Sequence, residues 1–169
     1  MMNDEALMLA FQHGSREAFD ELFARYRQPL YGYFRRRLAS RERAEDLTQE
    51  AFLAVLRATE RYQPRAAVRT YLYGISIKLL AAERRKLARV ECAADPVCDP
   101  AADKALWVRQ ALDRLEPMER EILMLREYEQ LSYAEIAELL RLPLNTVRTR
   151  LFRSRAALRS YLEPASNEA

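Results

Sequence analysis

Residues 130–159, QLSYAEIAELLRLPLNTVRTRLFRSRAALR, hold two short helical patterns separated by a proline. Ser132 and Glu135 have the spacing of a capping box, which predicts the start of a helix with one apolar face. Pro143 cannot continue that helix, and a second helix is expected to open between Pro143 and Thr146. Two short helices joined by a tight break are typical of the helix-turn-helix that reads DNA.

The second of these helices combines an apolar stripe with a strongly basic surface. Val147, Leu151 and Leu158 form the stripe at helical spacing. Residues 141–162 contain six arginines and no Asp or Glu, which suits contact with DNA phosphates, although an arginine-rich face is also typical of an ordinary solvated surface. The candidate DNA-binding residues are Asn145, Thr146, Arg148 and Thr149 for base contacts, Arg153 and Arg155 for phosphates, and Arg150 between them.

The composition of the 169 residues indicates an all-α protein. Half of the residues are hydrophobic and only 3 are glycine, with Ala, Leu, Glu and Arg dominating. Residues 91–103 contain prolines, acids, alanines and cysteines without a helical period, which predicts a linker. We therefore expect two small helical domains joined by a flexible linker, the C-terminal one a helix-turn-helix.

The net charge of +3 is unevenly distributed along the chain. Residues 1–90 hold 17 basic and 11 acidic residues, whereas residues 91–140 hold 5 basic and 12 acidic residues. Residues 141–162 are basic again. Two basic regions separated by an acidic one suggest two separate contacts with nucleic acid.

Several classes of protein are disfavoured by what the sequence lacks. No apolar run approaches the ~20 residues that span a membrane, and the N-terminus has acids where a signal peptide has bases, so we expect a cytoplasmic protein. Cys92 and Cys98 are expected to be free thiols in a reducing cytosol, although a redox role stays open. His13 is the only histidine and lies far from both cysteines, so no metal site and no cofactor are expected.

Apolar residues at helical spacing predict further helices along the chain. Gly14, Pro29 and the YQP sequence at 62–64 punctuate this pattern. Leu53 and Leu56 are among the residues that we expect to be available for burial. The expected helices span residues 5–13, 15–38, 42–57, 68–90 and 104–115, and another opens at Pro117.

In its motifs the chain resembles the extracytoplasmic-function (ECF) sigma factors, small promoter-recognition subunits of bacterial RNA polymerase that contain regions 2 and 4 of the sigma-70 family. The first half is similar to region 2 in AEDLTQEAFL (44–53), YQP (62–64) and RTYLYGI (69–75). The second half is similar to region 4 in LEPMER (115–120), LSYAEIA (131–137) and NTVRTRL (145–151). The order and spacing of these motifs make the resemblance specific.

This resemblance implies a sigma factor that directs promoter recognition and transcription initiation. Residues 1–90 would bind core RNA polymerase and the minus-10 element, and residues 104–162 would bind the minus-35 element. Residues 91–103 would be the linker and residues 163–169 a tail. The implied partners are promoter DNA, core RNA polymerase and an anti-sigma factor, which in this family is often a membrane protein.

The resemblance also assigns roles to residues of the first half. Asp46, Gln49 and Glu50 match the positions that dock on the clamp helices of the largest polymerase subunit. Aromatic rings suit unstacked bases and cations suit the DNA backbone. The candidate contacts to the minus-10 element are Tyr62, Arg65, Arg69, Tyr71, Tyr73, Lys78, Arg84 and Arg85.

Three positions depart from the family pattern. Tyr71 stands where Trp is usual, Lys78 where Asn is usual and Asn145 where Gly is common. Tyr71 keeps an aromatic ring, so core packing and stacking on DNA are both open for it. Lys78 can only donate hydrogen bonds, which favours contact with phosphate.

Two other functions fit parts of the sequence. The first is a helix-turn-helix regulator that binds DNA without being a polymerase subunit. The second is an enzyme acting on nucleic acid. Such an enzyme needs acidic metal ligands, and Asp46 and Glu50, at i, i+4 spacing, would imitate them. No nucleophile–base cluster or Gly-rich phosphate loop is present, so we expect no catalysis and no small-molecule substrate.

Overall fold

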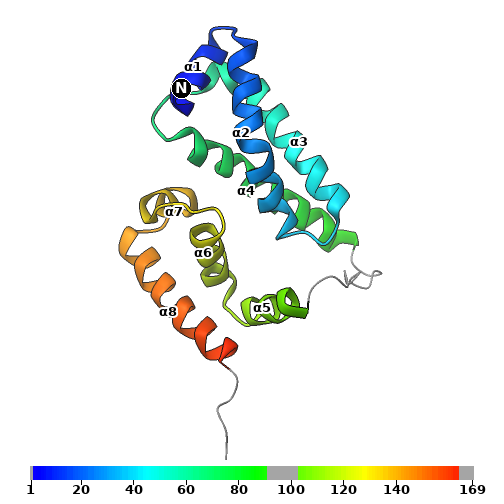
Figure 1. Cartoon of the computed structure of the whole chain (residues 1–169), viewed down its shortest axis with the longest axis vertical. Coiled ribbons are helices and arrows are strands. Elements are labelled where there is room, and N and C mark those ends of the chain that lie inside the picture. Colours follow the sequence, from blue (N-terminus) through cyan, green and yellow to red (C-terminus); the bar gives the residue numbers. More distant parts are fainter. Residues whose placement is uncertain (1, 91–102, 164–169) are drawn as a thin grey trace, which may run out of the picture. The chain divides into compact units, whose positions relative to one another are not determined.

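A computed structural model describes residues 2–90 and 103–163 of the chain. Most of the expected linker, with Cys92 and Cys98, and most of the expected tail lie outside the described residues. The chain divides into two compact units, Met1–Val97 and Cys98–Ala169, which we call unit 1 and unit 2 (Figure 1). In the described residues every regular element is helical, which confirms the expected all-α fold.

Unit 1 is organised around its second helix. Helices α1, α3 and α4 all pack against α2, and the core between them contains Leu30, Phe34, Leu47 and Val68. Asn3, Ser15 and Ser40 each accept a backbone hydrogen bond at the start of a helix, because a capping side chain satisfies an amide that has no partner within the helix. The elements are α1 (Asp4–Gln12), α2 (Arg16–Arg35), α3 (Arg41–Ala58), the 3-10 helix η1 (Thr59–Arg61) and α4 (Val68–Val90).

Two expectations for unit 1 were wrong in detail. Helix α2 runs unbroken through Pro29 but ends at Arg35, before Leu38, because the amide of Arg37 turns back to the carbonyl of Phe34 at 3.0 Å. Leu53 and Leu56 are 45% and 44% exposed. The face of α3 that packs on its neighbours carries Ala44, Leu47, Ala51, Phe52 and Val55.

A partly buried ion pair joins α3 to α4. The Arg43 guanidinium donates through Nε and Nη2 to the two carboxylate oxygens of Glu83, at 2.8 and 2.7 Å. Glu83 is only 5% exposed, and the hydrogen bond from Arg43 holds the pKa of this carboxyl below its ordinary value. The bidentate geometry fixes both helices at this point, because each carboxylate oxygen has its own donor.

Unit 2 is a four-helix unit in which the last helix contacts the other three. Its core is formed by Ile122, Leu125, Ile136, Val147 and Leu151, which are at most 1% exposed. The helices are α5 (Asp103–Asp113), α6 (Pro117–Glu127), α7 (Tyr133–Leu140) and α8 (Leu144–Leu162). Pro117 occupies the first turn of α6, where its missing amide hydrogen leaves no bond unmade.

The capping box expected at the start of α7 is confirmed. The Ser132 hydroxyl accepts from the Glu135 amide at 3.1 Å, and the Glu135 carboxylate accepts from the Ser132 amide at 2.7 Å. These two bonds satisfy amides that an uncapped helix start leaves without partners.

We expect Ser132→Ala to destabilise unit 2 by about 1 kcal/mol, because it removes one of these bonds. Urea unfolding of the full chain would be followed by the fluorescence of Trp107, the only tryptophan of the chain, which lies in α5. Ser160→Ala, at an exposed position near the end of α8, is the matched control. Equal unfolding midpoints for the two variants would contradict the assignment of the cap.

Helix α8 begins at Leu144, within the expected range, and its apolar stripe faces the core. Val147 and Leu151 are buried, Leu158 is half-buried and the small Ser154 lies buried in the same row. The Ser154 hydroxyl donates to the carbonyl of Leu151 at 3.0 Å. With this row turned inward, the opposite side of α8 faces solvent.

Candidate nucleic-acid interface

The outward side of α8 carries most of the residues expected to read bases. Asn145, Arg148 and Thr149 are exposed and Thr146 is half-buried. The Thr149 hydroxyl donates to the carbonyl of Asn145 at 2.9 Å, so its oxygen is left as an acceptor. These side chains lie in the first two turns of α8, the part of a recognition helix that approaches base edges.

The arginines of α8 fall into two groups, which the sequence does not distinguish. Arg150 pairs with Glu116 at 3.1 Å, and Arg155 donates through Nε and Nη2 to one oxygen of Glu127 at 3.0 and 2.6 Å. Both acids belong to α6 or its cap. Each of these two arginines thus has an acidic partner within unit 2, in a pair that stays exposed to solvent.

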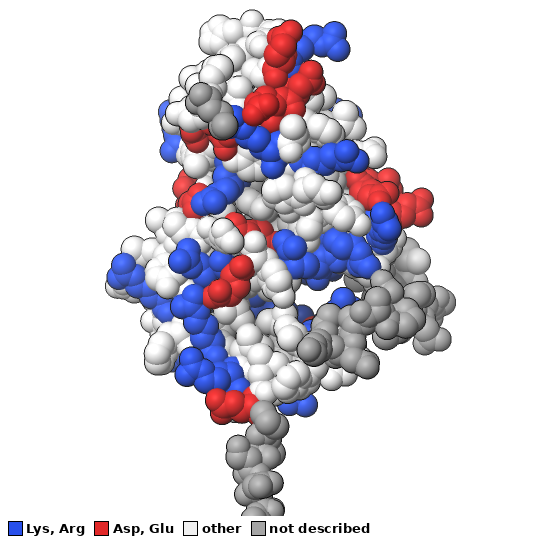
Figure 2. Space-filling model, in the orientation of Figure 1, with Lys and Arg blue, Asp and Glu red and all other residues white. Residues whose placement is uncertain are grey.

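The remaining arginines of residues 133–163 are Arg141, Arg148, Arg153 and Arg159. All are exposed, and within the described part of the chain none of their side chains makes a hydrogen bond or an ion pair. Basic side chains gather over α8 on the face shown in Figure 2. Uncompensated guanidinium groups on an exposed helix form the kind of surface that attracts a polyanion.

In unit 1 the candidate tyrosines differ in how deeply they are buried. Tyr73 is 2% exposed, and its ring packs edge-on against that of Tyr33, with centroids 5.7 Å apart. Tyr62 is 5% exposed, and its ring centroid lies 5.3 Å from that of Tyr71. Both rings are thus largely buried within unit 1, which leaves little of Tyr62 or Tyr73 for the expected contact with DNA.

Tyr71 is compatible with both roles that the sequence left open, core packing and stacking on DNA. Its ring is half-buried against Tyr62, and burial raises the pKa of its hydroxyl. Lys78 and Arg85 follow Tyr71 at intervals of seven residues, so they lie on the same side of α4 and are exposed. One side of α4 thus presents an aromatic edge and two cations.

The other basic candidates of unit 1 do not join this row. Arg69 and Arg84 lie on other sides of α4, and Arg69 is half-buried whereas Arg84 is exposed. Arg65 is exposed in the segment that precedes α4.

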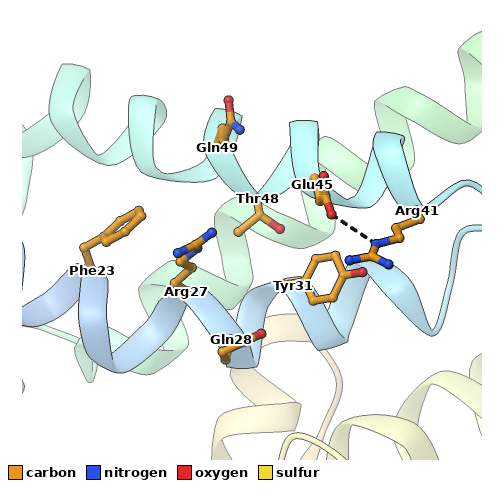
Figure 3. A pocket seen from close by; sticks show the side chains of 8 residues that line it. All are labelled: Phe23, Arg27, Gln28, Tyr31, Arg41, Glu45, Thr48 and Gln49. Atoms are coloured by element: carbon orange, nitrogen blue, oxygen red, sulfur yellow. Dashed lines mark hydrogen bonds and ion pairs between the residues drawn. The ribbon is translucent and has the colours of Figure 1, made fainter.

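The residues that match the polymerase-docking positions lie on α3. Gln49 and Glu50 are exposed, while Asp46 accepts a hydrogen bond from Arg43 at 3.0 Å and keeps 44% of its side chain exposed. Gln49 also borders a hollow of about 220 Å³ between α2 and α3 (Figure 3). The other side chains around it are Phe23, Arg27, Gln28, Tyr31, Arg41, Glu45 and Thr48. This part of unit 1 therefore offers polar groups around a shallow depression.

Among the described residues no group of three or more His, Cys, Asp or Glu side chains is arranged to hold a metal ion. Asp46, one of the two acids that would imitate a metal site, is paired with Arg43. No helix in the described ranges is long and apolar enough to cross a membrane.

Unpaired, exposed arginines on the second helix of a helix-turn-helix are typical of DNA-binding proteins. Residues 22–90 match the family model for Sigma-70 region 2, and residues 105–158 match that for Sigma-70, region 4. The chain belongs to the sigma-70 family and, within it, to the ECF sigma factors.

Relatives of known identity match over almost the full length. The RNA polymerase sigma-H factor of Pseudomonas aeruginosa is 32% identical, with 98% of this chain and 97% of the relative covered. The ECF RNA polymerase sigma-E factor of Haemophilus influenzae is 28% identical, with 96% of this chain and 97% of the relative covered.

Solved structures show the same architecture. CnrH, solved in complex with the cytosolic domain of CnrY, aligns with a TM-score of 0.74 and 25% identity over 96% of this chain and 99% of CnrH. The sigma factor RpoE from Bartonella quintana, solved with the anti-sigma factor NepR, gives a TM-score of 0.73 over 87% of this chain and 98% of RpoE. At 18% identity, the second likeness shows the fold alone.

Proposed function

We propose that the two units of this ECF sigma factor divide promoter recognition between them, with unit 2 on the minus-35 element and unit 1 on the minus-10 element and on core RNA polymerase. The observation that carries the proposal is the outward side of α8, where Arg148 and Arg153 are exposed and unpaired while Arg150 and Arg155 are held by acids of unit 2. This leaves a basic surface next to the base-reading positions.

Within this surface the first two turns of α8 read bases and the later part holds the backbone. Asn145, Thr146, Arg148 and Thr149 contact base edges, because a recognition helix enters the major groove with its N-terminal residues. Arg153, further along, contacts phosphate.

Unit 1 contacts the minus-10 element through α4 and the segment before it. Lys78 and Arg85 hold the DNA backbone along one side of α4, and the exposed edge of Tyr71 is available to an unstacked base. Arg65, Arg69 and Arg84 are further candidate backbone contacts on neighbouring surfaces.

An ordinary helix-turn-helix regulator is the second candidate function. The match to region 2 over residues 22–90 favours the sigma factor, since a regulator that uses only unit 2 would not need it. Mobility shifts of a selected promoter fragment with the full chain, with core polymerase and with both together separate the two functions. A sigma factor gives a sequence-specific complex only with both, whereas specific binding by the chain alone, unchanged by core polymerase, identifies a regulator.

Asp46, Gln49 and Glu50 on α3 are the proposed docking contacts with core polymerase, and Asp46→Arg is expected to weaken that binding by about tenfold or more. Asp46 pairs with Arg43 and its side chain is 44% exposed, so the same change is expected to cost unit 1 up to about 1 kcal/mol of stability. Affinity for core polymerase would be measured by fluorescence anisotropy of the labelled full chain.

Two neighbouring charge reversals separate docking from stability. Glu50→Arg is expected to weaken polymerase binding without the loss of stability, because Glu50 is exposed and has no hydrogen bond or ion pair among the described residues. Glu42→Arg, at an exposed acid in the first turn of the same helix, is expected to leave polymerase binding unchanged. Normal affinity of a folded Asp46→Arg variant would show that the docking surface lies elsewhere.

An anti-sigma factor is the third proposed partner, and the protein is expected to work in the cytoplasm beside the polymerase. The support is that CnrH, which is 25% identical to this chain, was solved with the cytosolic domain of CnrY. A cytosolic domain as partner is compatible with an anti-sigma factor anchored in the membrane. The family acts by binding rather than by catalysis, and we assign no enzymatic step to this chain.

A further inference from the structure

The turn between α7 and α8 is closed by a residue in the left-handed conformation. Arg141 has φ 53° and ψ 46°. Its amide donates to the carbonyl of Glu138 at 3.3 Å, and the amide of Leu142 donates to that of Ala137 at 2.9 Å. These two bonds form a Schellman motif, in which glycine is strongly preferred at the position of Arg141 because a Cβ atom disfavours left-handed backbone.

Nothing described in unit 2 explains why an arginine occupies this position. The side chain of Arg141 is exposed, and within residues 2–90 and 103–163 it makes no hydrogen bond or ion pair. Glu138, the acid nearest in sequence, makes no ion pair with it. Glycine would suit this backbone better, so the turn itself does not account for the guanidinium.

The location of the turn indicates what the guanidinium contacts. Arg141 lies three residues before Leu144, the first residue of α8, and the N-terminal part of α8 is the part that approaches the bases. In a helix-turn-helix the first helix crosses the DNA backbone and the second enters the groove, so the turn between them is expected near the phosphates. The planar guanidinium, with five donors, matches the oxygens of a phosphate group.

We propose that Arg141 is a DNA-phosphate contact that positions the N-terminus of α8 in the major groove. The proposal rests on the proposed function of unit 2 and adds a residue that base reading by α8 does not include. Arg141, before the start of α8, and Arg148, in the second turn of α8, then both contact DNA.

The test uses the full chain with core polymerase and a duplex that the wild-type chain has selected from a random library. Arg141→Gly and Arg141→Asn are expected to weaken binding about tenfold at 0.1 M salt and to reduce the salt slope by about one unit. For each of these two variants, the factor by which affinity falls should be the same on the selected duplex and on a scrambled duplex. Arg141→Lys keeps the charge and is expected to retain most of the affinity.

Gln130→Gly is the matched control for the backbone. Gln130 also has a left-handed conformation, with φ 55°, and is exposed in the turn before α7, but it carries no charge. Both glycine variants are expected to raise the melting temperature of unit 2, measured by Trp107 fluorescence, by roughly 2 to 6 °C. Only Arg141→Gly should lose affinity for DNA.

Two outcomes overturn the proposal. Wild-type affinity and salt slope in Arg141→Gly would show that the arginine is merely tolerated at the turn. A loss of sequence preference at one base pair, without weaker binding to other sequences, would show that Arg141 reads a base instead of holding a phosphate. If the wild-type chain with core polymerase selects no sequence at all, the proposed function of unit 2 fails, and that result is visible before any variant is compared.

Discussion

Replacing Arg43 with methionine is expected to lower the free energy of unfolding of unit 1 by about 3 kcal/mol. The guanidinium of Arg43 supplies a separate donor to each oxygen of Glu83, which is only 5% exposed. Methionine keeps much of the side-chain volume but leaves the carboxylate buried without its positive partner. An uncompensated buried charge is far more destabilising than the loss of an exposed pair.

The neighbouring pair of Arg41 and Glu45 provides the control. It lies on the same helix at 3.2 Å but is 77% and 52% exposed, so Arg41→Met is expected to change stability by no more than about 0.5 kcal/mol. Urea unfolding would be followed by circular dichroism, with the transition of unit 2 identified separately by Trp107 fluorescence. The double variant Arg43→Met, Glu83→Met should recover much of the loss, since it removes the orphaned charge as well. Equal effects of the two single arginine variants would contradict the assignment.

The same pair makes the stability of unit 1 depend on pH. Arg43 lowers the pKa of Glu83 below its ordinary value of 4.5, so the pair stabilises the fold fully above that pH. Its contribution is lost as the pH falls through the lower pKa of the folded state. The difference in stability between wild type and Arg43→Met should therefore narrow as the pH falls. In the variant, burial without a cation raises the pKa of Glu83, so its carboxyl takes up a proton and loses the orphaned charge already above its ordinary pKa. In the wild type, the contribution of the pair is lost below that pKa. A difference that stays constant down to pH 3 would argue against this coupling.

The second large effect is expected at Arg148, where alanine should cost about 1–3 kcal/mol on the preferred minus-35 sequence and relax the preference at one base pair. Arg148 is exposed in the first part of α8 and has no partner among the described residues. Arg153→Ala should instead weaken binding to all sequences about equally and reduce the salt slope by about one unit. The two arginines thus have different signatures, because one reads a base and the other holds a phosphate.

Arg155→Ala tests whether an ion pair within unit 2 reduces the contribution of an arginine to DNA binding. Because Glu127 already neutralises Arg155, this variant should change the salt slope less than Arg153→Ala does. Binding of the full chain with core polymerase would be measured on matched and scrambled minus-35 duplexes across a salt series. Loss of sequence preference in Arg153→Ala, with only uniform weakening in Arg148→Ala, would mean that α8 is rotated in the groove relative to our assignment.

The sequence by itself determined the helices and the helix-turn-helix. Its signals are local: the Ser15, Ser40 and Ser132 hydroxyls each accept a bond from an amide three residues ahead, and apolar residues at helical spacing mark the buried side of each helix. The start of α8 near Pro143 and the inward row of Val147 and Leu151 follow from such short-range rules. For the same reason the order of motifs was enough to indicate the family.

Only the tertiary structure decided which side chains remain available for function. Arg150 and Arg155 find their acids 34 and 28 residues away, and Arg43 finds Glu83 40 residues away. Tyr73 is taken into the core by Tyr33, from another helix. Helical periodicity gives the direction of a side chain but not the neighbour that it meets, which depends on how helices distant in sequence pack together. The basic sequence of α8 therefore predicted a DNA-binding helix, but only its packing against α6 distinguished the arginines without an acidic partner from those that are paired with an acid of unit 2.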